Sequence, residues 1–335
     1  MILPPDINIT THFHPEDLKT LENIETSEKI LFETTTYFNE IAITENQFGR
    51  FLKFGDSYQA GILKHGLYQG NLHYTNYFLL APLFNQNIKN ILILGMGTGN
   101  LAHNFLKLIP DLKNIDIVEI DPEVVDVAQK YFDFKPDKKI NVHIQDARVF
   151  VRNIKNKYDL IILDIFTSSG LPYRFMTEEF LRETNTILNK NGIIFTNMFG
   201  LQNIDSDNNL IFKSLLKTYK SVFNQVLVQP ALYGNIELYR TLFGLKHDLT
   251  ELTNILIIAS NSKTLLSKRK IIDKAQKMQD KFNIIGIKKI DKYAGDIFEI
   301  EINVNQYKNF LDNEEEELKL NLNNLKEYLK CSNPK

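Results

Sequence analysis

Glycines cluster directly after the apolar run Ile91–Leu94, in the segment 95–99 (Gly-Met-Gly-Thr-Gly), and a helical pattern follows them. Glycine lets the backbone turn sharply and come close to a ligand. The start of the following helix offers N–H groups that have no partner within the helix. Gly95, Gly97 and Gly99 are therefore candidate ligand-binding residues. The alternative is a tight turn between strand and helix without a ligand.

Two carboxylates, Glu119 and Asp121, follow the second apolar run, Ile115–Val118. Ligands of open parallel sheets bind beyond the carboxyl ends of the strands, so we expect Glu119 to face the glycine segment. Its carboxylate can accept hydrogen bonds from both hydroxyls of a ribose, and a surface position is the alternative. Asp121 precedes Pro122, so a ligand role and a helix-capping role are both open for it.

Two further carboxylates, Asp146 and Asp164, follow the segments 141–144 and 158–163. Asp146, with Ala147 after it, can accept a hydrogen bond from an adenine amino group while nearby backbone N–H groups meet the ring nitrogens. The alternative for Asp146 is a helix N-cap. Asp164 ends the run Tyr158–Leu163, and a carboxylate there can stabilise a cation and orient or deprotonate an attacking amine. Asp164 is therefore the candidate catalytic residue, with a loop cap as the alternative.

Strands and helices must alternate to position these residues. Strands are expected at 91–94, 115–118, 141–144, 158–163 and 192–196. Helical patterns separate them, which predicts an α/β fold with a parallel, doubly wound sheet. No long helical pattern separates the two last expected strands, so we expect them to form an antiparallel hairpin at the sheet edge; they lie at 225–228 and 254–259.

The flanking segments predict two smaller parts. Aromatic and branched residues at 37–44 and 50–54 predict a small N-terminal antiparallel β domain, followed by an amphipathic helix at 72–85. Charged stretches at 263–281 and 305–330 predict a C-terminal helical extension. The predicted organisation is a lead-in at 1–30, the β domain with its linking helix at 31–87, a nucleoside-binding catalytic domain at 88–262 and the extension at 263–335.

Composition excludes several classes of protein. The 335 residues are 43% hydrophobic and 24% charged, as in ordinary globular proteins. The formal net charge of −2 gives no field that favours nucleic acid, and the single cysteine, Cys331, cannot form an internal disulfide. There is no secretory signal pattern, and no apolar run approaches the roughly 20 residues that cross a bilayer. We therefore expect a cytoplasmic protein without nucleic-acid or membrane partners. The seven histidines show no paired metal-ligand spacing, so no metal is expected.

The spacing Gly-x-Gly-x-Gly at 95–99 departs from the dinucleotide fingerprint, because Asn100 stands where that fingerprint has glycine. S-adenosylmethionine (SAM) enzymes generally show this form. The run 91–199 as a whole resembles the catalytic domain of the spermidine synthase (polyamine aminopropyltransferase) family. The resemblance rests on the glycine segment, Val-Glu-Ile-Asp at 118–121, Gln-Asp-Ala at 145–147 and Tyr-Asp-Leu-Ile-Ile-Leu-Asp at 158–164. With weaker motifs it extends over residues 32–260.

This resemblance implies a Rossmann-like SAM-methyltransferase sheet with a small N-terminal β domain. It implies polyamine biosynthesis, with decarboxylated SAM as co-substrate, no metal, and transfer of an aminopropyl group to a polyamine or related small amine. It also implies a homodimer as one expected assembly. Residues that match family ligand or catalytic positions are Gln59, Glu119, Asp146 and Asp164, and expected substrate contacts are Tyr74, Phe166, Thr167 and Tyr233.

Three positions depart from the family pattern. Thr98 stands where the family has an Asp that contacts the donor's aminopropyl amine, and Asn76 and Thr167 replace two further acids. A dicationic diamine favours paired carboxylates, so the acceptor stays open. A neutral residue at 98 tolerates the carboxylate of intact SAM, so a SAM-dependent methyltransferase is the alternative function. A non-catalytic nucleoside-binding homologue is a third hypothesis. We expect Arg174, near the site in sequence, to face solvent.

Overall fold

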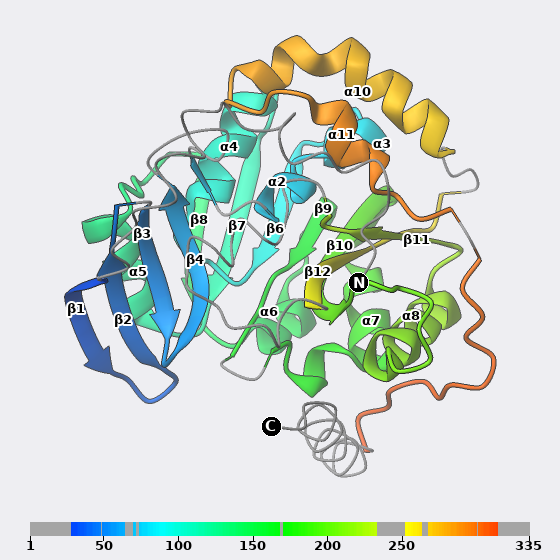
Figure 1. Ribbon diagram of the computed structural model, residues 1–335, viewed down its shortest axis with the longest axis horizontal. Helices are drawn as coiled ribbons and strands as arrows, with labels where there is room; N and C mark the ends of the chain where they lie inside the picture. The colour runs from blue at the N-terminus through cyan, green and yellow to red at the C-terminus, as the bar shows by residue number, and fades with distance from the viewer. Residues whose placement is uncertain are drawn as a thin grey trace, which may run out of the picture.

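A seven-stranded sheet built from the apolar runs lies at the centre of the molecule (Figure 1). The computed structural model describes residues 28–47, 49–63, 70–71, 74–167, 170–232, 252–262, 267–299 and 301–313. The strands of the central sheet are β6 (Asn90–Leu94), β7 (Asn114–Glu119), β8 (Ile140–Ile144), β9 (Tyr158–Leu163), β10 (Leu188–Leu201), β11 (Gln225–Pro230) and β12 (Leu252–Ser260). Strands covered on both faces read as continuous apolar runs, as most of these do.

The strand order of this sheet is β11-β12-β10-β9-β6-β7-β8. Neighbours from β10 to β8 are parallel, whereas β12 is antiparallel to both β10 and β11. This confirms the expected mostly parallel sheet with an antiparallel pair at one side. Within that pair β12 is the inner strand and β11 forms the edge. The carboxyl ends of β6, β7, β8 and β9 consequently meet at the same side of the sheet.

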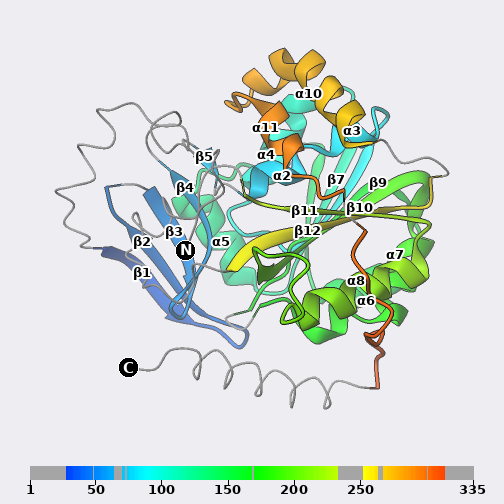
Figure 2. The same ribbon diagram turned by 45° about the vertical axis from the view of Figure 1, so that its right-hand side comes forward.

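Helices cover both faces of the central sheet (Figures 1 and 2). In β6, Ile91 and Ile93 pack into one core, and Leu92 and Leu94 pack into the other, because side chains alternate across a strand. The first core is closed mainly by α4 (Asn100–Leu108), α5 (Pro122–Tyr131), α10 (Lys268–Asn283) and α11 (Ile290–Gly295). The second is closed by α6 (Ala147–Asn153), α7 (Glu178–Thr186) and α8 (Leu210–Val222). The result is a three-layer sandwich whose strand ends are left free to carry polar loops.

A second sheet stands beside the first and is entirely antiparallel, with its five strands in chain order (Figure 2). Its strands are β1 (Lys29–Thr35), β2 (Glu40–Glu45), β3 (Gly49–Phe54), β4 (Ser57–Leu63) and β5 (Gly70–Asn71). This confirms the expected antiparallel N-terminal sheet. The first strand begins at Lys29, inside the stretch predicted as a lead-in.

The buried carboxylate of Asp121 connects the two sheets. Its Oδ2 accepts hydrogen bonds from Thr36 Oγ1 at 2.6 Å and from Asn39 Nδ2 at 2.9 Å, both in the turn between β1 and β2. Its Oδ1 accepts from the backbone N–H of Glu123 at 3.1 Å and so caps α5. One side chain therefore fixes the β1–β2 turn against the first turn of the helix that follows β7.

Two predicted helices differ from the structure. The single helix expected at 72–85 is divided into α2 (Thr75–Phe78) and α3 (Ala81–Phe84). Pro82 explains the division, since within a continuous helix it lacks an N–H and its ring clashes with the preceding turn. The helix expected at 305–330 is wrong for 305–313, which are not helical, and its remaining residues lie outside the described ranges. The helix expected at 263–281 corresponds to α10.

The segment that follows α11 passes around the β11 edge of the central sheet. The Phe298 N–H donates to the Val228 carbonyl oxygen at 2.9 Å, which gives β11 a bonded neighbour at its outer side. Residues before this point pack into the first core through α10 and α11, whereas Ile302, Val304 and Phe310 pack into the second. The chain beyond residue 262 therefore belongs to both layers of helices, and the predicted domain boundaries stay predictions.

We expect Asp121→Ala to lower the free energy of unfolding by about 2–3 kcal/mol, because it removes a buried carboxylate that accepts from the partly buried Thr36 and Asn39 side chains and caps α5. Asp126→Ala, at an exposed position of the same helix, is the matched control and should change it by less than about 0.5 kcal/mol. Urea denaturation of both variants measures the difference. Equal losses in the two variants would contradict a connecting role for Asp121.

Candidate active site

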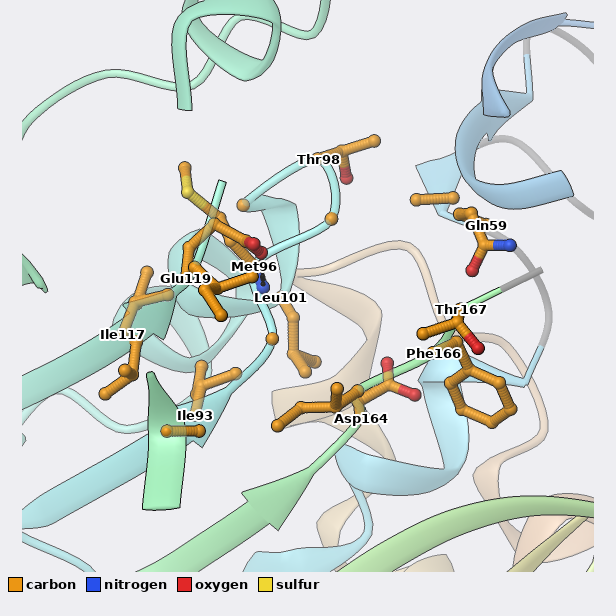
Figure 3. Close-up of a pocket in the computed structure, with 18 of the residues that line it drawn as sticks. Gln59, Ile93, Met96, Thr98, Leu101, Ile117, Glu119, Asp164, Phe166 and Thr167 are labelled. Carbon is orange, nitrogen blue, oxygen red and sulfur yellow. Dashed lines mark hydrogen bonds between the residues drawn. The ribbon is translucent and has the colours of Figure 1, made fainter. Parts of the chain in front are cut away.

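A cavity of about 260 Å³ lies where the glycine segment, the carboxyl ends of β7 and β9 and the N-terminal sheet meet. In Figure 3, Glu119 lies beside Met96 at one side, Asp164 beside Phe166 and Thr167 at the other, and Gln59 approaches from the N-terminal sheet. Predicted site residues that line this cavity are Gln59, Tyr74, Gly95, Gly97, Gly99, Glu119, Asp146, Ala147, Asp164, Phe166 and Thr167. The structure therefore brings most of the predicted site together.

The glycine segment needs glycine for steric reasons. Gly95 has φ +95°, and a Cβ there would lie 2.3 Å from the carbonyl oxygen of Asp164. Gly99 has φ +73°, and its Cβ would lie 2.3 Å from the ring of Phe134. Side chains are excluded from both positions. The segment consequently lies directly against the residue that ends β9.

Glu119 ends β7 and is held by backbone N–H groups. Met96 N donates to its Oε2 at 3.1 Å, and Asp121 N donates to its Oε1 at 3.0 Å. Burial raises the pKa of the carboxyl, and these backbone hydrogen bonds oppose the rise. A carboxylate has about four acceptor sites, so each oxygen keeps capacity for a ligand hydroxyl while the side chain is locked in place.

Asp146 caps α6, as its alternative interpretation predicted, and also lines the cavity. Its Oδ1 accepts from Val149 N at 2.9 Å and from an Arg174 Nη at 2.9 Å. Its Oδ2 has no hydrogen-bond partner within the described part of the chain. Arg174 is exposed to solvent, as expected, and it also lines the cavity. Capping and ligand contact are therefore compatible for Asp146, one oxygen for each.

Asp164 is held by two uncharged donors. Asn197 Nδ2 donates to Oδ1 at 2.9 Å, and the Tyr74 hydroxyl lies 3.3 Å from Oδ2. Burial raises the pKa of this carboxyl from 3.8 to about 6, and the two hydrogen bonds only partly oppose the rise. A carboxyl with such a pKa exchanges its proton near neutral pH, which suits acid–base chemistry.

The wall beside Asp164 is largely aromatic. Tyr74 bridges this carboxylate and the N-terminal sheet, because its hydroxyl also lies 3.3 Å from the Gln59 carbonyl oxygen. The Phe166 ring makes an edge contact with Phe199, with centroids 5.1 Å apart. This part of the cavity can accept a cation or an alkyl chain, since aromatic faces attract both.

Two predicted site residues are not part of the observed cavity. Asp121 is not among the residues that line it and forms the connection described above. Tyr233 lies outside the described residues. Of the three departures from the family pattern, Thr98 and Thr167 line the cavity. Asn76 instead donates to the Tyr293 hydroxyl of α11 at 3.1 Å.

Sequence reasoning missed Asn197 and the aromatic contribution of the N-terminal sheet. Asn197 follows the predicted strand at 192–196, so the rule that selected Asp164 could have found it. Its Oδ1 is in turn held by Asn254 Nδ2 at 3.0 Å. Phe38 and Phe54 also line the cavity, and no local signal distinguishes them from core residues of a small β sheet.

Within the described ranges, no group of three or more His, Cys, Asp or Glu side chains is arranged to hold a metal ion. In the same ranges, no helix combines the length and the apolar character that a membrane crossing requires.

Together the sheet, the glycine segment and the carboxylates at the strand ends define a Rossmann-like protein of the SAM-methyltransferase type. A family model described as "Spermine/spermidine synthase domain" matches residues 73–238. A polyamine aminopropyltransferase of Vibrio vulnificus (strain CMCP6) is 33% identical over 205 residues, which cover 58% of this chain and 66% of that protein. One of Prochlorococcus marinus (strain MIT 9312) is 29% identical over 222 residues, which cover 63% of this chain and 72% of that protein. The chain belongs to the spermine/spermidine synthase family.

Solved structures support the same fold. A probable spermidine synthase of Corynebacterium glutamicum ATCC 13032 gives a TM-score of 0.59 at 19% identity, over 75% of this chain and 87% of that one. A spermidine synthase in complex with the transition state analogue AdoDATO gives 0.54 at 20% identity, over 76% and 78%. At this identity the structural likeness shows the fold alone.

The raised pKa of Asp164 predicts a pH-dependent stability difference between the wild type and Asp164→Asn. A folded-state pKa of about 6 against 3.8 means that the folded protein holds this proton more tightly than the unfolded chain. The stabilising contribution is then complete below about pH 4, is lost as the pH rises to about 6, and stays absent above it. Urea denaturation from pH 4 to pH 7 should show the variant gaining stability relative to the wild type over this window. A difference independent of pH would contradict the assignment.

Proposed function

We propose that this chain transfers an aminopropyl group from decarboxylated SAM to a small amine. The placement of Asp164 carries the proposal. This carboxylate faces the same cavity as Glu119 and the glycine segment, and its pKa of about 6 lets it accept a proton from a protonated amine near neutral pH. The family membership of the chain supports the same reaction class.

The proposed donor lies with its nucleoside along the glycine segment. Glu119 accepts from the ribose hydroxyls, and Asp146 Oδ2 accepts from the adenine amino group beside Ala147. The free acceptor capacity of both carboxylates supports this orientation. It brings the sulfonium of the donor toward Asp164, where a negative charge stabilises it.

In the proposed reaction the acceptor amine approaches from the aromatic side of the cavity, along Tyr74, Phe166 and Thr167. Asp164 orients the amine and accepts its proton, which frees the nitrogen lone pair. A nitrogen–carbon bond forms as the carbon–sulfur bond breaks, and the electron pair of the broken bond stays on sulfur. The leaving group is therefore the neutral thioether 5′-methylthioadenosine. Holding the two reactants in line at attack distance is the main contribution of the protein.

A SAM-dependent methyltransferase is the second candidate function, and Thr98 favours it. This nearly buried residue lines the cavity next to the glycine turns and carries no charge. It supplies neither a carboxylate for the amine of decarboxylated SAM nor a repulsive charge against the carboxylate of SAM. The amine substrate, the cytoplasmic location and a homodimer stay proposals alongside the reaction itself.

Titration calorimetry with decarboxylated SAM, SAM and 5′-methylthioadenosine distinguishes the candidates. For the aminopropyltransferase we expect decarboxylated SAM to bind at least about tenfold more tightly than SAM, a difference of about 1.4 kcal/mol. The opposite preference supports the methyltransferase. Binding of none of the three would support neither enzyme.

We expect Asp164→Asn to abolish aminopropyl transfer while 5′-methylthioadenosine affinity stays within about tenfold of the wild type. In the wild type, kcat/KM should fall below about pH 6, because protonated Asp164 cannot accept the proton of the amine. Thr98→Ala, which changes an uncharged cavity residue, is the control and should retain turnover. Full activity of Asp164→Asn would remove Asp164 from the mechanism.

A further inference from the structure

The guanidinium of Arg148, whose side chain is only 6% exposed, is a fully hydrogen-bonded centre beside the cavity. Its Nε and one Nη donate to Glu183 of α7 at 2.8 and 3.0 Å. Its two Nη groups donate to Asp312 at 2.7 Å each, and one also donates to the Arg174 carbonyl oxygen at 3.2 Å. A guanidinium has five N–H donors, and these contacts use all of them.

Asp312 reaches Arg148 from the C-terminal strap, which we define as residues 309–312. The strap is fixed along its length. The Phe310 carbonyl oxygen accepts from Glu178 N at 2.8 Å, and the Leu311 carbonyl oxygen accepts from the Tyr173 hydroxyl at 2.7 Å. The strap lies beyond the span of the family match at 73–238, so the family resemblance assigns it no role.

The Asp312 carboxylate is built into this position. Besides Arg148, it accepts from Thr177 Oγ1 at 2.7 Å. Burial alone would raise the pKa of Asp312, but the hydrogen bonds from Arg148 and Thr177 outweigh it and lower the pKa. Asp312 and Arg148 are therefore both charged at neutral pH.

Two connections lead from Arg148 to the nucleobase end of the cavity. Arg148 lies two residues after Asp146, in the first turn of α6. Its hydrogen bond to the Arg174 carbonyl also fixes the backbone of the residue whose side chain pairs with Asp146. Pro172, Arg174 and Phe175 all line the cavity. Arg148 is therefore connected both to the helix that Asp146 caps and to the part of the cavity wall that Arg174 lines.

We propose that Asp312 of the C-terminal strap is a positioning residue for the nucleobase end of the cavity, acting through Arg148 on Asp146 and Arg174. The proposal rests on the proposed function, in which this end of the cavity holds adenine. Without Asp312, Arg148 keeps its contact with Glu183 but has unpaired donors, and it can turn away from the Arg174 carbonyl. Residues 172–175 of the cavity wall then lose the hydrogen bond that connects them to α6. Nucleoside binding must then order these residues, which lowers the binding affinity.

The test compares Asp312→Ala with the matched control Asn309→Ala. Asn309 belongs to the same strap and donates to Glu178 at 2.7 Å, and it is not among the hydrogen-bond partners of Arg148. Affinity for 5′-methylthioadenosine is measured by calorimetry well below the melting temperature of each variant, and melting temperatures are recorded separately. We expect Asp312→Ala to weaken binding by about tenfold and Asn309→Ala by less than about twofold.

A kinetic measurement adds a readout that a purely structural role would not move. At saturating donor, kcat of Asp312→Ala should stay near the wild-type value while the KM for the donor rises, because Asp164 is outside this network. Wild-type affinity in Asp312→Ala, or equal weakening in both variants, would overturn the proposal alone. If the wild type binds none of decarboxylated SAM, SAM and 5′-methylthioadenosine, the proposed function is overturned together with the role proposed for Asp312.

Discussion

The cost of keeping a carboxylate out of water at the end of β9 shapes the whole site. Asp164 is held by the amide of Asn197 and the hydroxyl of Tyr74, and both are neutral. Such partners fix its orientation without supplying a countercharge, so the pKa stays raised at about 6. A cationic side chain in their place would lower the pKa and occupy the position that a cationic reactant needs. In the proposed reaction the substrates themselves supply the positive charge.

The three carboxylates of the cavity are held by different kinds of hydrogen-bond partner. At the proposed nucleobase end, Asp146 is paired with Arg174 and caps a helix. At the proposed ribose position, Glu119 is held by backbone N–H groups. These carboxylates are rigid hydrogen-bond acceptors. The pKa of Asp164, raised by burial to about 6, lies near neutral pH and suits proton transfer in this part of the cavity.

The sequence predicted the central sheet and the convergence of its strand ends, because continuous apolar runs and the residues after them follow from burial on both faces. It left Asp121 open between ligand and cap, and the structure shows the cap. The division of the helix expected at 72–85 follows from the chemistry of Pro82, whereas the apolar pattern alone indicates one continuous helix. The contacts of Asn39 with Asp121 and of Asp312 with Arg148 span 82 and 164 residues. No local pattern encodes which distant segment a side chain will meet, so these could not be predicted.

The position of β12 has a consequence for how this chain can be divided. The span recognised as the family domain ends at residue 238, whereas β12 begins at Leu252 and lies between β10 and β11. A recombinant fragment cut at that limit would lack a strand from the interior of its own sheet. It would leave the edge of β10 with unpaired backbone N–H and C=O groups, which favour aggregation, and it would leave β11 without its hydrogen-bonded neighbour. The span that the family model matches is therefore shorter than the part of the chain that forms the sheet, and a fragment for crystallisation needs the chain through at least the end of β12 at Ser260.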